Sequence, residues 1–258
     1  MLLKSCAKVN PGLDILGKDS VTSFHFLKTV FYEIEDLFDE IELKTKDNLS
    51  TEILCDNKDV PRDNKNTMFK ATNILQNKFN IKQGVQIKIK KNIPMGGGLG
   101  GGSSNGASIL KALNKLWNLD LNNDELRILA EKIGMDAPFF IEGGVALGEN
   151  FGEKITIIKN APKLNLEILN FPNISIDTPW AYKNIDEYDV GKDVKKTENL
   201  IFALGKNDLA QIKENIHNDF EPLIFKNFPE IRKEMDKISK KGAKAHLTGS
   251  GSSLFIVH

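Results

Sequence analysis

The sequence has little cysteine, no long apolar run and no excess of charge. Cys6 and Cys55 are the only cysteines among 258 residues, so we expect free thiols in a reducing cytoplasm rather than a disulfide scaffold or a zinc site. The segment from Met1 to Lys8 lacks the apolar stretch of a signal peptide, and no run approaches the roughly 18 apolar residues of a membrane span. Basic and acidic residues both number 35, which argues against a polyanion such as nucleic acid as partner.

The composition fits a soluble globular protein. Apolar residues make up 40% of the chain and charged residues 27%, and the length allows one large domain or two modest ones. We expect a cytoplasmic protein, a monomer or a weak homodimer, with a small-molecule partner and neither a membrane nor a nucleic acid.

A strand, a glycine run and a helix follow one another near the middle of the chain. Val85, Ile87 and Ile89 alternate with polar residues, which predicts a strand with one buried face. After the glycines, Ser103 or Ser104 is expected to cap a helix whose apolar positions recur every three or four residues from Ala107.

The remaining elements mix helices and strands irregularly. A helix is predicted from Asn122, with Glu125 as its capping partner, to Gly134. Further helices are expected over 67–79, 200–216 and 228–238, strands over 39–43, 49–54, 144–147, 154–158, 164–169 and 254–257, and a mobile polar loop over 183–196. This order favours an α+β fold over a doubly wound sheet.

The glycine run is the strongest functional signal. Six of the seven residues from Gly96 to Gly102 are glycine, with Pro94 before them and Ser103 after. Glycine lets backbone N–H groups approach an anion closely, and the N-terminus of a following helix adds partial positive charge. A flexible linker is the alternative, but a linker does not usually stand between a strand and a capped helix. Phosphate binding is therefore predicted.

Two familiar phosphate loops do not fit. A P-loop requires Lys and Ser or Thr directly after its last glycine, whereas Ser103 follows Gly102 and the next lysine is Lys111. The dinucleotide fingerprint matches at Gly96, Gly98 and Gly101, but the expected second strand with its ribose-binding acid is missing.

The segment Pro94-Met95-Gly96-Gly97-Gly98-Leu99-Gly100-Gly101-Gly102-Ser103-Ser104 resembles the ATP loop of the GHMP kinases. The segments 7–10, 134–140 and 247–252 are similar to the branch of that family that acts on 4-diphosphocytidyl-2-C-methyl-D-erythritol, in the non-mevalonate isoprenoid route. The resemblance implies an ATP-binding domain over 1–150 with a left-handed βαβ crossover, and a ferredoxin-like domain over 151–258. It also implies ATP as co-substrate, with Mg²⁺.

The resemblance further implies roles for two charged residues. Asp136 would accept or orient the proton of the acceptor hydroxyl, and Lys8 would stabilise the Asp136 carboxylate and offset charge near the transferred group. By position alone, Asp136 is a turn residue after a helix end and Lys8 a solvated residue near a terminus. Ser103 or Ser104 would contact the metal, and no dedicated carboxylate cage is implied.

Substrate residues are implied at four positions. Phe24 would stack on a cytosine and His25 would hydrogen-bond to it, while Asn10 and Thr178 would contact the polyol or the nucleotide. A core aromatic beside a structural histidine, and simple turn or cap residues, are the alternatives. The family usually has Asp-Gly-Tyr-His where this chain has Thr-Ser-Phe-His, which weakens the cytidyl assignment.

A second glycine turn lies near the end of the chain. Gly249, Ser250 and Gly251 would lie near the active site by resemblance, or simply lead into a strand. The chain stops at His258, whereas the family usually continues, so this member is short or truncated.

Three rival functions stay open. The first is a GHMP kinase for another alcohol, such as homoserine or mevalonate; the second is a protein that binds ATP without turnover. The third, an NAD-dependent oxidoreductase, is disfavoured by the missing strand.

Overall fold

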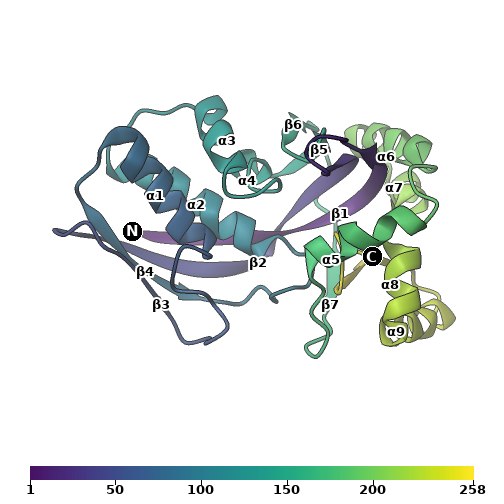
Figure 1. Ribbon diagram of the computed structural model, residues 1–258. Helices are drawn as coiled ribbons and strands as arrows, with labels where there is room; N and C mark the ends of the chain where they lie inside the picture. The colour runs from purple at the N-terminus through teal and green to yellow at the C-terminus, as the bar shows by residue number, and fades with distance from the viewer. The chain divides into compact units, whose positions relative to one another are not determined.

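The computed structural model describes all residues from 1 to 258 (Figure 1). The chain divides into two compact units, whose segments alternate along the sequence. Unit 1 comprises residues 1–7, 34–93 and 100–143, and unit 2 comprises residues 8–33, 94–99 and 144–258. Two long strands, β1 (Leu2–Lys18) and β2 (His25–Lys46), contribute residues to both units. None of the helices has the length and apolar character needed to span a bilayer.

Unit 1 is a sheet with helices on one face. Strand β4 (Gly84–Lys90) runs antiparallel to β2 and parallel to β3 (Thr51–Cys55), and helix α1 (Thr67–Phe79) joins β3 to β4. Figure 1 shows α1 and α2 (Gly101–Leu116) on the same face of these strands. The alternating residues of β4 are buried, as a strand with one covered face requires. Helices α3 (Asn123–Glu131) and α4 (Phe139–Glu142) complete the unit.

Unit 2 contains two groups of strands. In the first, β5 (Val145–Glu149) pairs with β2 and β6 (Lys154–Ile157), and β8 (His217–Asn218) runs parallel to β1. The second is a three-stranded antiparallel sheet in the order β7 (Leu166–Leu169), β10 (Leu254–Val257), β9 (Ala245–Leu247). Its helices are α5 (Thr178–Asn184), α6 (Val194–Lys206), α7 (Leu209–Asn215), α8 (Glu221–Asn227) and α9 (Pro229–Lys240).

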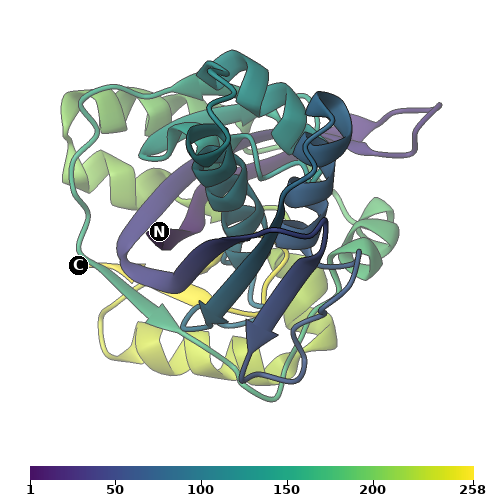
Figure 2. The same ribbon diagram turned by 90° about the vertical axis from the view of Figure 1, so that its left-hand side faces the viewer.

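An apolar core in unit 2 joins this second sheet to its helices. Figure 2 shows α8 and α9, in yellow-green, beneath the yellow strands β9 and β10. Phe220, Ile224 and Leu254 are fully buried in the cluster, which also includes Leu247 and Ile231. Burial of such side chains is the main stabilising contribution in this part of the chain.

Most predicted elements are confirmed. Helix α1 has the predicted bounds, α3 starts with the predicted capping box of Asn122 and Glu125, and β10 covers 254–257. Strand β1 was missed because residues 7–15 are buried without a break, so the alternation of a half-covered strand is lacking.

Two predictions about helix ends and one about a loop are wrong. Helix α2 is capped by Gly100, at φ 70°, and not by a serine, because the glycine run itself turns into the helix. The single helix over 200–216 is two helices, since Asn207 adopts a left-handed conformation that ends α6. The loop over 183–196 carries a short 3₁₀ turn at Ile185–Glu187, with Ile185 fully buried, and the first turn of α6.

A buried ion cluster anchors the segment that leads into the glycine run. Asp39 is fully buried and accepts hydrogen bonds from the ammonium of Lys91, the amide of Asn105 (2.9 Å) and the backbone N–H groups of Asn92 (2.8 Å) and Ile93 (2.9 Å). A buried carboxylate requires such compensation. The cluster therefore fixes residues 91–93 next to β2.

We predict that Asp39→Asn lowers the free energy of unfolding by about 3 kcal/mol, because the Lys91 charge loses its buried partner. The matched control is Glu40→Gln, which removes an exposed carboxylate paired with Lys90 and leaves stability essentially unchanged. Urea unfolding of both variants is the measurement. Equal losses in the two variants would contradict this role of Asp39.

Candidate active site

Lys8 is the central charged residue of unit 2. Its side chain on β1 is buried, with 2% of the residue exposed. The ammonium donates to Oδ1 of Asn10 at 2.5 Å and to the carbonyl of Gly98 at 2.8 Å, and the Lys8 backbone N–H donates to Leu99 O at 3.0 Å. Since burying an ammonium costs several kcal/mol without oxygen partners, these contacts hold Lys8 against the first half of the glycine run.

Asn10 is held by two further hydrogen bonds. Its backbone N–H donates to Thr248 Oγ1 at 3.1 Å, and its side-chain amide donates to Thr29 Oγ1 at 2.9 Å. The Thr29 hydroxyl in turn donates to the carbonyl of Gly12 at 2.8 Å. These bonds orient the Asn10 amide so that its oxygen faces Lys8.

The turn over 248–253 packs against the glycine run. The N–H of Ser253 donates to Gly97 O at 3.2 Å, and Asn218 supports the turn by donating to Gly249 O at 2.9 Å. Gly98 has φ 75°, and a Cβ there would lie 2.2 Å from the carbonyl oxygen of Thr248. A Cβ on Gly249 would lie 3.3 Å from Lys8 Nζ, so the second glycine turn adjoins Lys8.

The second half of the glycine run starts helix α2 in unit 1. The first N–H groups of a helix have no partner within it, and Gly102 in this first turn is exposed. Thr67, at the start of α1, donates to Gly102 O at 2.6 Å and fixes the turn. The hydroxyl of Ser104 points inward to Ser5 at 2.7 Å, whereas Ser103 lies beside Gly134. An anion would therefore meet backbone N–H groups and Ser103 here.

Asp136 lies in unit 1, in the turn between α3 and α4. It is half-buried, and the side chains of Ala137, Phe139 and Phe140 after it are buried. The two phenylalanine rings meet edge to face at 5.0 Å, and Lys111 fixes the turn by donating to Phe140 O at 2.7 Å. The turn that carries Asp136 is thus followed directly by buried apolar side chains.

The segment before Phe24 forms a tight turn, although Ser23 stands where the family has glycine. Ser23 adopts a left-handed φ of 62°, and Thr22 donates from its backbone N–H (2.7 Å) and its hydroxyl (2.5 Å) to Asp19. The Thr22 hydroxyl and N–H lower the pKa of Asp19 from its usual value. Phe24 itself is 52% exposed, and its ring is tilted on Phe151 at 5.6 Å, which leaves a face for a stacking partner.

His25 belongs to a group that includes two residues the sequence did not single out. Its Nε2 lies 2.6 Å from Asp186 Oδ1, and its ring stacks on Tyr182 at 5.3 Å. Lys18 donates to the other Asp186 oxygen at 2.8 Å. The hydrogen bond from His25, and then that from Lys18, lower the pKa of Asp186.

Asp186 and Tyr182 were missed for a simple reason. Asp186 falls in the charged segment that was predicted to be a mobile loop, and Tyr182 in a helix that was not predicted. The pair Thr178-Pro179 after Asp177 is the signal that was available, because proline in the first turn and an aspartate cap are typical of a helix start.

Thr178 lies at the start of α5, where its hydroxyl is 3.1 Å from that of Ser250. The structure thus connects Lys8, Asn10, Gly98 and Thr178 through the turn over 248–253, all in unit 2. Phe24 and His25 form a second group in the same unit. Ser103 and Asp136 lie in unit 1, where their elements adjoin.

Comparison with known proteins identifies the class. The N-terminal domain family of GHMP kinases matches residues 66–144, and the C-terminal domain family matches residues 200–258. The fold is similar to that of homoserine kinase from Cytophaga hutchinsonii (TM-score 0.72, 20% identity, 99% of this chain and 86% of that one). The predicted α+β class and the two-domain GHMP kinase fold are confirmed.

More similar relatives indicate which branch of the GHMP kinases the chain belongs to. Enzymes named 4-diphosphocytidyl-2-C-methyl-D-erythritol kinase from Caldicellulosiruptor saccharolyticus and Clostridium novyi are 36% and 37% identical over 256 residues, which is 99% of this chain and 87% and 90% of theirs. A crystal structure of 4-(cytidine 5'-diphospho)-2C-methyl-D-erythritol kinase has TM-score 0.78 and 26% identity, and covers 100% of this chain and 90% of that one. The chain belongs to the 4-diphosphocytidyl-2-C-methyl-D-erythritol kinase family of GHMP kinases.

We predict that Gly98→Ala destabilises the protein several times more than Gly144→Ala. Both glycines have positive φ values, 75° and 70°, so alanine is strained at both positions. Only Gly98 also has a carbonyl oxygen where the new methyl group would lie, whereas nothing lies within 4 Å at Gly144. Thermal and urea unfolding measure the difference, and similar losses would mean that the loop does not pack on Thr248.

Proposed function

We propose that the protein transfers the terminal phosphoryl group of ATP to the 2-hydroxyl of 4-diphosphocytidyl-2-C-methyl-D-erythritol, a step of non-mevalonate isoprenoid synthesis. The observation that carries the proposal is the buried Lys8 ammonium, bound to Gly98 O at the glycine run. A fixed positive charge beside a phosphate-binding loop is what phosphoryl transfer needs. The kinship with enzymes of this name supports the choice of acceptor.

In this proposal the segment 94–104 binds the phosphates of ATP. Its glycines expose backbone N–H groups, and the N-terminus of α2 contributes partial positive charge. Ser103 adds a hydroxyl on the first turn of the helix, while Ser104 keeps its structural bond to Ser5. Binding thus depends on the shape of the backbone more than on charged side chains.

Asp136 and Lys8 have different roles in the proposed reaction. Asp136 accepts the proton of the acceptor hydroxyl, and the apolar side chains after it exclude water from the reacting oxygen. Lys8 neutralises negative charge that develops on the transferred group. A lysine already held by two oxygens needs little reorganisation during the reaction.

Four residues of unit 2 bind the acceptor. Phe24 stacks on the cytosine with its exposed face, and His25, oriented by Asp186 and Tyr182, hydrogen-bonds to the base. Asn10 and Thr178 contact the polyol or the diphosphate from beside the turn over 248–253. Phe24 keeps the aromatic ring that the family has as tyrosine, so stacking does not depend on the lost hydroxyl.

Mg²⁺ fits this site as a companion of ATP. No group of three or more His, Cys, Asp or Glu side chains in the structure could hold a metal ion by itself. The phosphates would therefore supply most of the oxygen ligands, and Ser103 is the protein hydroxyl available at the loop. The ion would neutralise the phosphate oxygens.

We predict that Asp136→Asn lowers kcat by about 10²–10⁴-fold, because the amide cannot accept the proton. The matched control is Asp120→Asn, which changes an exposed aspartate in a left-handed turn of the same unit and leaves kcat unchanged. The assay follows ADP release with 4-diphosphocytidyl-2-C-methyl-D-erythritol, ATP and Mg²⁺, with product mass as a check. An Asp136→Asn variant with native turnover would rule out Asp136 as the proton acceptor.

We predict that Phe24→Ala raises the KM for the cytidyl substrate about tenfold, through the loss of stacking, and leaves the KM for ATP unchanged. Phe202→Ala, which removes a phenylalanine that is 69% exposed on α6, is the control. The same assay with homoserine and mevalonate tests the rival acceptors. Turnover of one of these in place of the cytidyl substrate would reject the proposed acceptor and leave the kinase class intact.

A further inference from the structure

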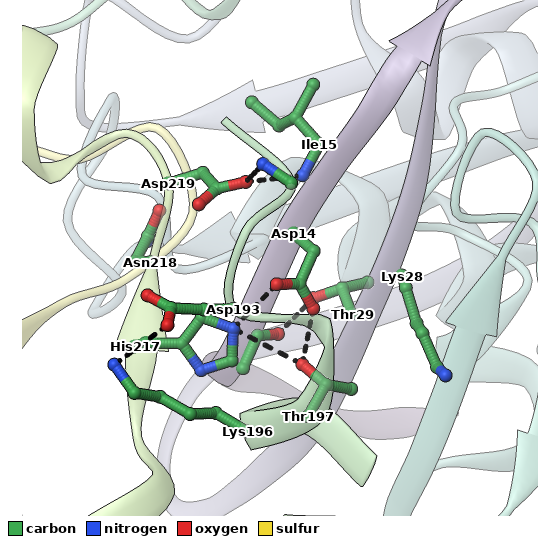
Figure 3. A network of polar contacts seen from close by, with 12 residues as sticks. Asp14, Ile15, Lys28, Thr29, Asp193, Lys196, Thr197, His217, Asn218 and Asp219 are labelled. Carbon is green, nitrogen blue, oxygen red and sulfur yellow. Dashed lines mark hydrogen bonds and ion pairs between the residues drawn. The ribbon is translucent and has the colours of Figure 1, made fainter. Parts of the chain in front are cut away.

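A row of polar positions runs along one face of β1. Lys8, Asn10, Gly12 and Asp14 alternate along the strand, so they share a face, and the three side chains are at most 2% exposed. The proposed function uses Lys8 and Asn10 but gives Asp14 no role. Figure 3 shows where Asp14 points: toward Thr197 of α6 and His217 of β8.

Asp14 is a fully buried carboxylate with two side-chain partners. Its Oδ2 accepts from the Thr197 hydroxyl at 2.5 Å, and its Oδ1 lies 2.9 Å from His217 Nε2. The partners are 183 and 203 residues away in the chain. Strand β8 brings His217 there, because it runs parallel to β1 with His217 opposite Gly12.

Both nitrogens of the His217 ring face acceptors. Nδ1 lies 3.0 Å from the carbonyl of Asn215, and Nε2 faces Asp14. A neutral imidazole has one donor and one acceptor nitrogen, so with an ionised Asp14 either tautomer would point a lone pair at an oxygen. The imidazolium donates at both positions and also compensates the buried carboxylate.

The surrounding charges favour the protonated ring. Burial lowers the pKa of His217, but the hydrogen bonds to Asp14 and Asn215 O and the charges of Asp14 and Asp193 outweigh it, so the pKa is raised. Asp193 is itself paired with Lys196 at 3.0 Å. The other ionisable groups near this ring are Asp219, Glu221 and His246 in unit 2. Lys28 of β2 lies beyond Thr29 as seen from the ring (Figure 3).

The cluster touches β1 at Gly12, which connects it to Lys8. A Cβ on Gly12 would lie 3.0 Å from Thr197 Oγ1 and 3.6 Å from His217 Cε1, so both side chains pack directly on the strand backbone. The carbonyl of Gly12 accepts from Thr29, Thr29 accepts from the Asn10 amide, and Asn10 binds the Lys8 ammonium. Each link is a hydrogen bond between buried groups.

We propose that Asp14, Thr197 and His217 form a buried ion-pair clamp, with His217 as the imidazolium, that positions Asn10 and through it Lys8. His217 is then a positioning residue and not a catalytic one. The clamp joins α6 and the end of α7 to the strand that carries Lys8. The effect of the clamp on turnover rests on the proposed function, whereas the charge state of His217 can be tested without it.

The charge state is tested by ¹⁵N NMR of the four histidines of the native chain at pH 7, with His217 assigned by its absence in His217→Gln. The clamp predicts that both His217 nitrogens give imidazolium shifts. His246 is the internal contrast, since burial first, and then the charges of Lys244 and His217, lower its pKa to about 3 and keep it neutral. A neutral His217, with the proton on Asp14 instead, would overturn the clamp.

The positioning role is tested by kinetics. We predict that His217→Gln lowers kcat about tenfold with little change in the KM for ATP. Thr197→Val lowers kcat less, and Thr197→Ser, which keeps the hydroxyl, leaves kcat near the native value. The matched control is His258→Gln, which breaks a half-exposed pair with Glu167 at 2.9 Å and leaves kcat unchanged. A His217→Gln variant that loses stability and keeps the native kcat would make the cluster merely structural.

The pH dependence of kcat follows from the direction in which the pKa of His217 is shifted. Because the pKa of His217 is raised in the folded protein, its contribution is complete below the ordinary histidine pKa and is lost as pH rises through the raised value. The native kcat is therefore expected to fall as pH rises through this value, and the kcat of His217→Gln is expected to lack this fall. An unchanged pH profile of kcat in His217→Gln would overturn the positioning role.

A native protein without turnover would reject the proposed function alone. The positioning role would still be tested by NMR, because the signal of Lys8 Cε shifts in His217→Gln if the clamp positions Lys8.

Discussion

The burial of the Lys8 ammonium is the constraint on which the site depends. A lysine with 2% exposure is stable only where oxygens replace its water, and here these are Asn10 Oδ1 and Gly98 O. The strand must therefore present Asn10 on the same face, and the glycine run must turn its carbonyl toward β1. The positive φ of Gly98 and its close approach to Thr248 explain why glycine stands there.

The same requirement recurs at two buried aspartates, one in each unit. Asp14 is compensated by Thr197 and His217, and in unit 1 Asp39 is compensated by Lys91 and Asn105. A core made of apolar residues would cost less to bury than these groups. What the buried pairs provide is a fixed geometry: Asp39 holds the segment before the glycine run, and the β1 row holds the lysine beside it. The bound conformation of a site built in this way requires little further ordering.

Local sequence patterns predicted the elements whose signals are local. The capping box of Asn122 and Glu125, the alternation in β4 and the periodicity of α1 all act within a few residues, and the structure confirms them. The glycine run predicted a phosphate loop for the same reason, and resemblance supplied Lys8 and Asp136. Contacts over long sequence distances could not be predicted: the pairs His25 with Asp186 and Asp14 with His217 depend on which strands and helices meet. The start of α2 was misplaced because glycines in a helix contradict their usual propensity.

The role of Lys8 in the reaction is tested most directly by the turnover of Lys8→Met, which keeps most of the length of the side chain and removes its charge. We expect a folded protein that still binds ATP and the acceptor with KM values near the native ones, while kcat falls by about 10²–10³-fold, because the charge acts on the transferred group. A Lys8→Met protein that kept the native kcat would contradict this role, since the buried ammonium would then serve the fold and not the reaction.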